Sequence, residues 1–376
     1  MGNIPEIFES CPAVYAVGKN YIITVPVKSR CYMWAKVGDK MYYDESNGTL
    51  RKLRLVHKVT VPMDELNEAK EYTLYFRNYS SDKDEPVVSE YTSSFRPVDP
   101  AKEKINVYHL ADVHSSHVEA VSAAGYFESI GEDMDFLILN GDIFNDGNEL
   151  WWFTMHHKVA GQITRGEIPV VHARGNHDTR GEYAEYFADY MPAENGNSYY
   201  TFRLGSIWGI CLDAGEDKAD DHEEYNYANI FDRFRENETK WLESIALAEK
   251  PEFLDEGIKY RIIVCHSPFS RRHRPPFNID EDRFAYWCKL LRENVKPHVM
   301  MNGHYHTFYI SLPGDEYDAF DLACPSLVGG KAERIEGTKH YTGSAFTICG
   351  NKLQIRYTDE AREVKGKAEI QLGIDK

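Results

Sequence analysis

The sequence lacks the features that mark membrane proteins and disulfide-rich secreted proteins. No run of residues approaches the roughly 18 consecutive apolar residues that a membrane-spanning helix needs. The segment that starts at Met1 has neither the basic start nor the long apolar stretch of a secretory signal. The seven cysteines are odd in number and scattered, and no CxxC pair occurs, which is typical of reduced thiols. We therefore expect a cytoplasmic protein that does not contact a membrane.

Positive charge is also scarce in this sequence. The 43 Lys and Arg residues stand against 60 Asp and Glu residues, which gives a formal net charge of −17 at pH 7. Non-specific nucleic-acid binding needs a basic surface that displaces counterions, so the composition argues against it. The same negative field repels phosphate compounds, so any phosphate site in this chain must carry positive charge of its own.

The sequence does contain enough apolar material for two folded units. Its hydrophobic fraction is 42%, and a chain of 376 residues favours two domains. Over residues 11–96, short runs rich in Val, Ile, Tyr and Phe alternate with polar residues, which predicts an all-β sandwich. No cysteine pair matches the disulfide of immunoglobulin domains, so a fibronectin-like sandwich fits better. The expected strands are 20–27, 30–37, 55–61 and 71–78, with turns at Gly38-Asp39 and Asn47-Gly48.

After a linker around residues 97–104, apolar runs alternate with helical patterns. Such alternation predicts an α/β domain with a largely parallel sheet that is covered by helices. Antiparallel-looking runs at 199–212 and 344–357 indicate a second sheet. The expected strands are 105–110, 136–139, 168–171, 262–265 and 298–301, and the expected helices are 116–130, 149–164 and 231–249. We predict two domains, an all-β domain at 1–99 and an α/β domain at 100–376.

Residue types that bind metals follow each of these five strands. The groups are Asp112-Val-His114, Gly141-Asp142, Gly175-Asn176-His177-Asp178, His266 and Gly303-His304-Tyr305-His306. Because ligands collect at the carboxyl ends of strands in open α/β sheets, we expect these groups to meet. Residues i and i+2 of an extended segment point to one face, so both members of a D-x-H or H-x-H pair can enter one site. His and carboxylate ligands suit Mn, Zn, Fe or Co.

The order D-x-H, G-D, G-N-H-D, H, G-H-x-H resembles that of the calcineurin-like metallophosphoesterase superfamily, over roughly residues 105–310. The resemblance implies a two-sheet αββα sandwich. A small immunoglobulin- or fibronectin-like domain before such a domain is also reminiscent of purple acid phosphatases. The chain departs from their pattern at His114, where they lack a histidine ligand, and at Asn145, where they have a metal-binding tyrosine. These departures argue against a mixed-valence iron site with a tyrosinate ligand.

The resemblance implies a dinuclear metal site that hydrolyses a phosphomonoester or a phosphodiester. One divalent ion would be held by Asp112, His114, Asp142 and His306, and the other by Asp142, Asn176, His266 and His304. Asp142 would thus bridge the two ions. Their charge exceeds that of two carboxylates and one hydroxide by about one unit, which attracts phosphate to the acidic protein. The hydroxide that bridges the ions would attack phosphorus.

The resemblance also implies that His177 is the general acid that protonates the leaving oxygen. An imidazole in this role needs a partner that orients it, and Asn145 or Asp146 could be that partner. An asparagine at the position of Asn145 occurs in relatives that cleave diesters, which favours a diester. The metal ligands themselves suit both classes of ester.

The most basic run near the expected site is Arg271-Arg272-His273-Arg274, which follows His266 closely. Its three guanidinium groups, on Arg271, Arg272 and Arg274, could bind a substrate phosphate bidentately, or the run could be a solvated loop. A second function of another class is a scaffold that keeps the fold and has lost its chemistry. All the motif positions are intact, which favours the enzyme, and the expected partner is a small phosphate ester. The oligomeric state and the role of the sandwich stay open.

Overall fold

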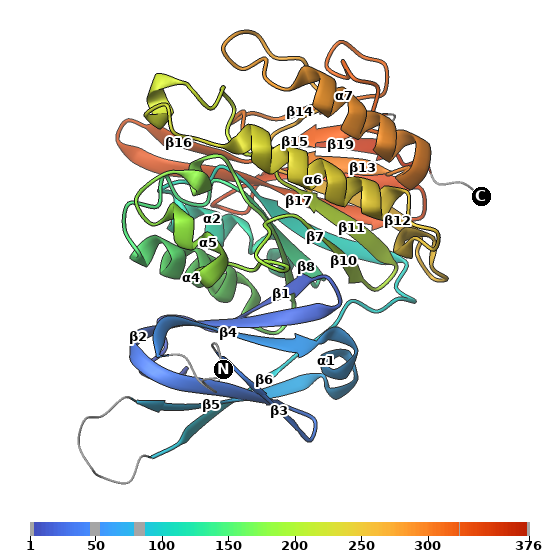
Figure 1. The fold of residues 1–376 in the computed structure, drawn as a ribbon. Coiled ribbons are helices and arrows are strands. Elements are labelled where there is room, and N and C mark those ends of the chain that lie inside the picture. Colours follow the sequence, from blue (N-terminus) through green and yellow to red (C-terminus); the bar gives the residue numbers. More distant parts are fainter. Residues whose placement is uncertain (1–3, 46–52, 79–86, 323, 374–376) are drawn as a thin grey trace.

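The computed structural model describes residues 4–45, 53–78, 87–322 and 324–373 (Figure 1). These residues form two mixed β-sheets with helices on their outer faces, and a β-rich N-terminal region. Both features agree with the predicted fold class. In the part of the chain that is described, no helix is both long and apolar enough to cross a membrane. The expected turn at Asn47-Gly48 lies outside the described residues.

The first sheet has 13 strands, and its main path runs in the order β19-β18-β17-β7-β8-β9-β1-β2-β5-β6. Strands β7, β8 and β9 are parallel neighbours, as expected from the alternating pattern. The strands of this sheet are β1 (Ala13–Val17), β2 (Asn20–Val37), β3 (Lys40–Tyr43), β4 (Arg54–Pro62), β5 (Glu71–Asn78), β6 (Ser89–Ser94), β7 (Lys104–Leu110), β8 (Phe136–Asn140), β9 (Pro169–Ala173), β16 (Lys331–Ile335), β17 (Thr338–Cys349), β18 (Lys352–Asp359) and β19 (Val364–Gln371).

The second sheet has six strands in the order β10-β11-β12-β13-β15-β14. Strands β11, β12, β13 and β15 run parallel, and the two edge strands are antiparallel to their neighbours. Its strands are β10 (Tyr200–Leu204), β11 (Ile207–Leu212), β12 (Tyr260–Cys265), β13 (Val299–Asn302), β14 (Tyr309–Ser311) and β15 (Ser326–Val328).

The main core lies between the two sheets. Leu137 of the first sheet and Ile262 and Val264 of the second belong to one buried cluster. Ile263, which points to the opposite face of β12, packs in a separate cluster with Leu242 of α6 and Trp287 of α7. Strands buried on both faces read as continuous apolar runs, which explains why the sequence marks them clearly. The loops that carry the site residues are therefore anchored to strands that are packed on both faces.

Helices cover the outer faces of both sheets, and Figure 1 shows α6 and α7 side by side over the second sheet. The helices are α1 (Met63–Ala69), α2 (His117–Ala123), α3 (Tyr126–Ser129), α4 (Trp151–Thr164), α5 (Phe187–Tyr190), α6 (Phe231–Ala246) and α7 (Glu281–Leu290). Shorter helical turns are η1 (His177–Thr179), η2 (Ala184–Tyr186), η3 (Glu223–Tyr225), η4 (Glu252–Leu254) and η5 (Leu291–Val295). The single helix predicted at 116–130 is wrong, because the chain ends α2 before Gly125 and begins α3 after it.

Strand β2 corrects a second prediction. The sequence predicts separate strands at 20–27 and 30–37, but β2 is one strand of 18 residues. Its middle residues Lys28, Ser29 and Arg30 are exposed, and the pairing with β4 shifts between Pro26 and Cys31. The polar residues therefore mark a change of partner rather than a turn. The first half of β2 pairs with β1 and β4, and the second half pairs with β3 and β5.

The first sheet continues across the predicted boundary between residues 99 and 100. Strand β1 pairs in parallel with β9, with Tyr15 opposite Val170. Helix α4 also packs closely on the N-terminal region, since a Cβ added at Gly161 would lie 2.1 Å from the carbonyl oxygen of Cys11. The division into domains at 1–99 and 100–376 stays a prediction, and the two parts share one sheet.

Candidate metal centre

The five predicted groups of metal-binding residues come together in the structure. Asp112, His114 and His306 offer ligand atoms that all lie within 4.8 Å of one another. Asp142 and His266 form a second such group with Asp112. The two groups share the buried Asp112 carboxylate, so the residues that follow β7, β8, β12 and β13 converge on one place.

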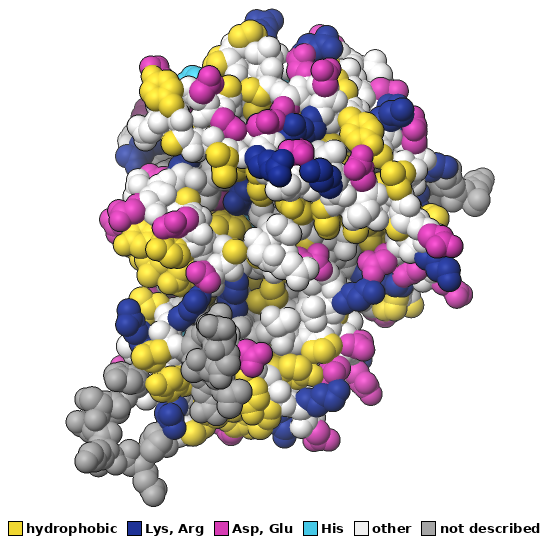
Figure 2. Space-filling view, viewed as in Figure 1, with side chains coloured by type: hydrophobic (Ala, Val, Ile, Leu, Met, Phe, Trp, Pro, Cys, Tyr) yellow, Lys and Arg dark blue, Asp and Glu magenta, His cyan; other side chains and the backbone are white. Residues whose placement is uncertain are grey.

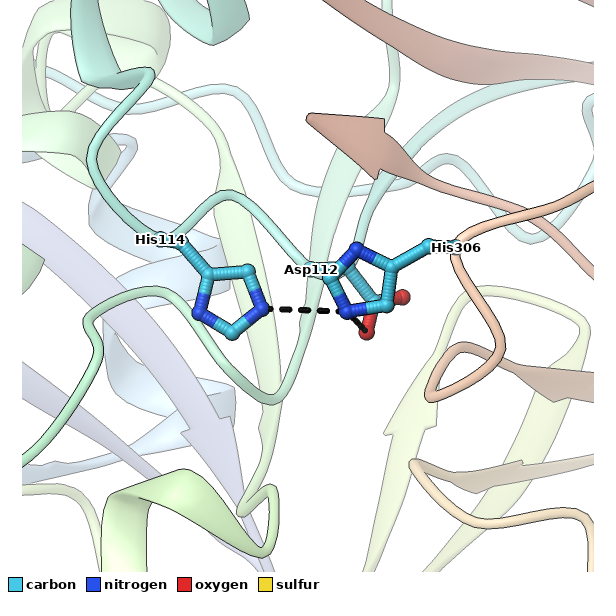
Figure 3. A group of neighbouring side chains, drawn as sticks. All are labelled: Asp112, His114 and His306. Atoms are coloured by element: carbon cyan, nitrogen blue, oxygen red, sulfur yellow. Dashed lines mark hydrogen bonds and ion pairs between the residues drawn. The ribbon is translucent and has the colours of Figure 1, made fainter. Parts of the chain in front are cut away.

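In the first group, the side chains of Asp112, His114 and His306 point toward one another (Figure 3). His114 Nε2 lies 3.2 Å from His306 Nε2, and the two rings stack at 4.9 Å. His306 Nε2 is 3.5 Å from Asp112 Oδ1. Two imidazole nitrogens and a carboxylate oxygen that point at one another form a ligand set of the kind that binds zinc and related ions.

The second group is fully buried. His266 Nε2 lies 3.1 Å from Asp142 Oδ2 and 3.9 Å from Asp112 Oδ1. The other ring nitrogen, Nδ1, donates a hydrogen bond to the Asn140 carbonyl over 2.7 Å, which turns Nε2 toward the carboxylates. Among the described residues, no hydrogen bond of good geometry satisfies Nε2 itself, although a carboxylate oxygen is near. A metal ion shared by this nitrogen and the two carboxylates would satisfy all three groups, so these residues fit such an ion.

His304 and Asn176 complete the set of seven predicted ligands. His304 Nδ1 lies 3.0 Å from Asn176 Oδ1, and its ring centroid is 5.5 Å from that of His266. Its other nitrogen, Nε2, faces Asp217 Oδ2 at 3.7 Å. The structure therefore places Asn176, His266 and His304 together, as the resemblance implies for the second ion. The sequence offered no signal for Asp217, which enters from the loop after β11.

The backbone at these residues adopts an unusual conformation. Five of the seven predicted ligands have φ angles between 48° and 75°: Asp112, His114, Asp142, His304 and His306. Residues other than glycine rarely adopt positive φ, and such conformations persist where surrounding structure enforces them, often at functional sites. The strain is thus concentrated where the predicted ligands are.

Gly175 lets the G-N-H-D loop approach Asp142 closely. A Cβ added at this position would lie 2.2 Å from Asp142 Oδ1 and 2.4 Å from the Asp142 amide nitrogen. Because the glycine has no side chain, the His177 amide can donate a hydrogen bond to Asp142 Oδ1 over 2.9 Å. As a result, Oδ1 of Asp142 faces the His177 amide and Oδ2 faces His266.

Two residues, Asn140 and Asp178, have supporting roles that the sequence did not predict, although Asp178 belongs to one of the predicted groups. The side-chain amide of Asn140, the last residue of β8, donates a hydrogen bond to the Met301 carbonyl in the second sheet over 2.9 Å. Asp178 Oδ2 accepts hydrogen bonds from the amides of Gly175 and Asp142 over 2.8 and 3.2 Å. Both residues hold ligand loops in place. The signal that could have found them is their position, because each is a polar residue within two positions of a predicted ligand in the sequence.

The buried carboxylates control the charge of their neighbours. Burial opposes the protonation of His266, but Asp142 and Asp112 outweigh it and raise the pKa of this imidazole to about 10. Burial raises the pKa of Asp112, whereas His266 and other nearby histidines hold the pKa of Asp142 below its usual range despite burial. The negative potential that favours a charged imidazole here equally favours a bound cation.

His177 is oriented differently from the prediction. Its Nδ1 donates a hydrogen bond to the main-chain carbonyl of Asn145 over 2.7 Å, so neither candidate side chain orients the ring. Asp146 instead accepts a hydrogen bond from the amide of Asn148. His177 Nε2 is left to face the cavity, where Arg180 Nη1 lies 3.5 Å away. Any main-chain carbonyl can fill this role, so residue identity at 145 could not reveal it.

A cavity of about 710 Å³ opens over the site. Asp142, Asn176, His177, His304 and His306 line it together with the three predicted arginines, Arg271, Arg272 and Arg274. The structure thus places the basic run on the wall of the same cavity. Two further cations, Arg180 and Lys218, also line it, and neither was predicted from the sequence.

The fold and the site define a class of protein. Two sheets packed face to face, with Asp, His and Asn ligands at the strand ends, are the features that the resemblance implies for metallophosphoesterases. Residues 105–308 match the model of the calcineurin-like phosphoesterase family, and the chain belongs to that family. Members of this family are generally metal-dependent hydrolases.

Comparison with one solved structure agrees at the level of the fold. The structure is similar to the purple acid phosphatase PPD1 from seeds of yellow lupin (Lupinus luteus), with a TM-score of 0.62 and 14% identity, over 97% of this chain and 75% of that chain. It also matches GAP50, described as the anchor in the inner membrane complex of Plasmodium, with a TM-score of 0.45 and 15% identity, over 73% of this chain and 90% of that chain. No curated protein sequence matches the chain.

Proposed function

We propose that the protein is a metal-dependent phosphoric ester hydrolase that acts on a phosphomonoester or a phosphodiester. The observation that supports this function best is the convergence of seven potential ligand side chains around Asp112 and Asp142. The family to which the chain belongs supports the same reaction class.

Two divalent ions fit the available ligands. One would be held by Asp112, His114, Asp142 and His306, and the other by Asp142, Asn176, His266 and His304. The candidates are Mn, Zn, Fe and Co, which share a preference for imidazole and carboxylate ligands. Such a pair of ions supplies positive charge for the phosphate and lowers the pKa of water toward neutrality.

The side chains of the protein then have distinct tasks. Asp142 connects the two halves of the site, because one of its oxygens faces His266 and the other accepts the His177 amide proton. His177 is the proposed general acid, which donates the proton on Nε2 to the leaving oxygen while the Asn145 carbonyl holds Nδ1. Arg180, 3.5 Å from that nitrogen, is placed to hold a phosphate oxygen.

The cavity is suited to a small phosphate ester, which is the proposed partner. All seven cysteines are described, and each is a free thiol. Reduced thiols are usual in the cytoplasm, and on this ground we propose a cytoplasmic location.

The proposed function is tested with 4-nitrophenyl phosphate and bis(4-nitrophenyl) phosphate. Protein treated with a chelator is assayed before and after addition of Mn, Zn, Co or Fe, and bound metal is measured by elemental analysis. We expect turnover that returns with metal and that the Asp142→Asn variant loses. Protein that binds no metal and hydrolyses neither ester would instead favour a scaffold without catalytic chemistry.

A further inference from the structure

The cations around the cavity fall into two groups, and the first is neutralised. Arg180 makes a bidentate ion pair with Glu216, with contacts of 2.6 and 2.9 Å. Lys218 lies 3.0 Å from Asp217 and 2.9 Å from Glu224. These carboxylates cancel most of the charge that the two cations would otherwise present.

The second group of cations consists of Arg271, Arg272 and Arg274, and these guanidinium groups are paired with carboxylates less completely. Arg272 pairs with Glu281 at 3.5 Å. Among the residues that the structure describes, no carboxylate lies within 4.0 Å of the guanidinium of Arg271 or of Arg274. In a chain with a net charge of −17, two unpaired guanidinium groups on one cavity wall are available for an anion that comes from outside.

Arg271 is held in a fixed orientation by aromatic rings. Its Cζ lies 4.5 to 5.5 Å from the ring centroids of Tyr305, Tyr309 and Tyr317. One of its N–H groups donates a hydrogen bond to the Tyr309 hydroxyl over 3.1 Å. A guanidinium has five N–H donors, so most remain available for a ligand. Stacking on aromatic faces orients the planar group without neutralising it.

The position of Arg271 separates its task from that of Arg180. Arg180 touches His177, on the side where the leaving group would lie. Arg271 contacts Tyr305, which stands between His304 and His306 and whose ring lies 5.2 Å from that of His304. These two contacts place the guanidinium within about 10 Å of the His304 ring. The scissile phosphate would lie at the metal ligands beside His177 and Arg180, so Arg271 is left for a different group.

We propose that the substrate carries a second anionic group, a phosphate or a carboxylate, and that Arg271 binds it with help from Arg274. This inference rests on the proposed function, and it names the class of ester. The guanidinium that would hold the second anion lies within about 10 Å of the His304 ring, which describes a compact metabolite or nucleotide rather than a polymer. Guanidinium binds both kinds of anion bidentately, so the chemistry is shared.

Matched esters test the proposal. For monoesters, the series is glycerol 3-phosphate, 3-phosphoglycerate and glycerol 1,3-bisphosphate, in which a carboxylate or a phosphate is added to one skeleton. For diesters, the pair is thymidine 5′-(4-nitrophenyl phosphate) with and without a 3′-phosphate. We expect the esters with a second anion to have a KM about 10- to 100-fold lower, which is the range expected for a charge-assisted hydrogen bond. The monoester series shows whether carboxylate or phosphate is preferred.

Variants connect this preference to Arg271. Arg271→Gln should remove most of the advantage of the second anion through a higher KM, and Arg271→Lys, which keeps the charge without the planar fork, should remove part of it. Arg203→Gln is the matched control, because Arg203 is exposed and pairs with Asp255 at 3.4 Å, outside the cavity. Thermal unfolding of each variant verifies that it is folded.

The outcomes separate the inference from the function on which it rests. Hydrolysis of simple esters with no advantage for the second anion would overturn the inference and leave the proposed function standing. The same holds if Arg271→Gln lowers kcat/KM equally for esters with and without the second anion. Absence of hydrolysis for every ester in the presence of metal would overturn both.

Discussion

At the scale of single residues, the site depends on how tightly the atoms of Asp142 are held. Its Oδ1 accepts the His177 amide proton, its Oδ2 faces His266, and its own amide donates to Asp178. Asp142 follows β8, and its partners lie in the loops after two other strands, β9 and β12. A displacement of any one loop would therefore move the carboxylate that connects the two predicted metal positions.

The first prediction concerns Gly175. In Gly175→Ala the new Cβ would lie 2.2 Å from Asp142 Oδ1, so the carboxylate must move. Because displacement of a reacting group by about 1 Å costs about 100-fold in rate, we expect a loss of that order in kcat/KM together with weaker metal binding. Gly373→Ala is the control, since nothing lies within 4 Å of its Cβ position. Wild-type activity and metal content in Gly175→Ala would contradict this account of the loop.

The second prediction concerns His177. We expect His177→Ala to retain its metal ions, because His177 Nδ1 is bonded to the Asn145 carbonyl and Nε2 faces the cavity. Turnover should fall by about 10²- to 10⁴-fold, as for other general acids. The loss should be larger for phenyl phosphate than for 4-nitrophenyl phosphate, whose leaving group needs less protonation. Equal losses for the two esters, or loss of metal, would show that the role of His177 is misassigned.

The predicted ligands could be found from the sequence because each follows an apolar strand within a few residues. Short spacing such as D-x-H then determines which side chains share a face. Arg180, Lys218 and Asp217 could not be found in this way. They stand on long loops, and their place at the cavity depends on tertiary contacts such as the ion pair between Arg180 and Glu216.

At the scale of elements, helix α4 joins the N-terminal strands to the first sheet. Nδ1 of His157 in α4 lies 3.1 Å from the Tyr15 hydroxyl in β1 and 3.2 Å from the Thr24 hydroxyl in β2, and it can accept a hydrogen bond from Tyr15. Its neighbour His156 is buried against His172 of β9 at a ring distance of 4.6 Å, and neither ring nitrogen of His156 has a hydrogen-bond partner among the described residues. The junction is thus built on neutral imidazoles.

The third prediction follows from these histidines. Burial and the neighbouring His172 hold the pKa of His156 well below its ordinary value near 6.5. Below pH 6.5 only the unfolded chain takes up this proton, so stability is full above that pH and decreases as the pH falls. Between pH 7.5 and 5.5, each such histidine should lower the free energy of unfolding by about 1.4 kcal/mol. His156→Phe should remove one such contribution, as measured by urea unfolding at both pH values.

An unchanged pH dependence in His156→Phe would contradict the prediction, because it would mean that His156 is protonated in the folded protein. His222→Phe provides the comparison, because His222 is only half-buried.

The sequence predicted most elements of the metallophosphoesterase fold, since strands β7, β8, β9, β12 and β13 are buried on both faces and read as apolar runs. It did not predict that β1 joins the sheet of β7, β8 and β9, because strand patterns do not reveal partners that lie far away in the sequence. Nor did it find α7, whose helix begins after a loop rich in Arg and Pro. The local sequence pattern thus identified individual strands and helices more reliably than it identified which strands pair in a sheet.

At the scale of the whole molecule, the N-terminal region shares a sheet with the strands that carry the predicted ligands. Strand β1 covers the edge of β9, and an ion pair of 2.9 Å joins Glu9 to Lys158 of α4. Figure 2 shows basic and acidic side chains interspersed over one face of the molecule, so no single-sign patch dominates that face. The basic wall of the cavity is therefore a local feature of a molecule that is acidic as a whole.

The fourth prediction concerns the isolated fragment 100–376. Without β1, the edge of β9 and the surface of α4 around His157 are exposed. An uncovered strand edge promotes aggregation, so we expect this fragment to be insoluble or aggregated where the full chain is soluble. Size-exclusion chromatography and thermal unfolding compare the two. A monomeric, active fragment would show that the predicted domain at 100–376 folds independently.

The pairing of β1 with β9 also bears on how the protein is made. A ribosome produces Tyr15 long before Val170, its partner across the two strands. At typical synthesis rates of about 5 to 20 residues per second, the time between synthesis of Tyr15 and synthesis of Val170 is on the order of 10 s. During this interval β1 has an edge without its partner β9. We therefore expect a nascent-chain chaperone to bind the chain mainly before residue 173 is synthesised.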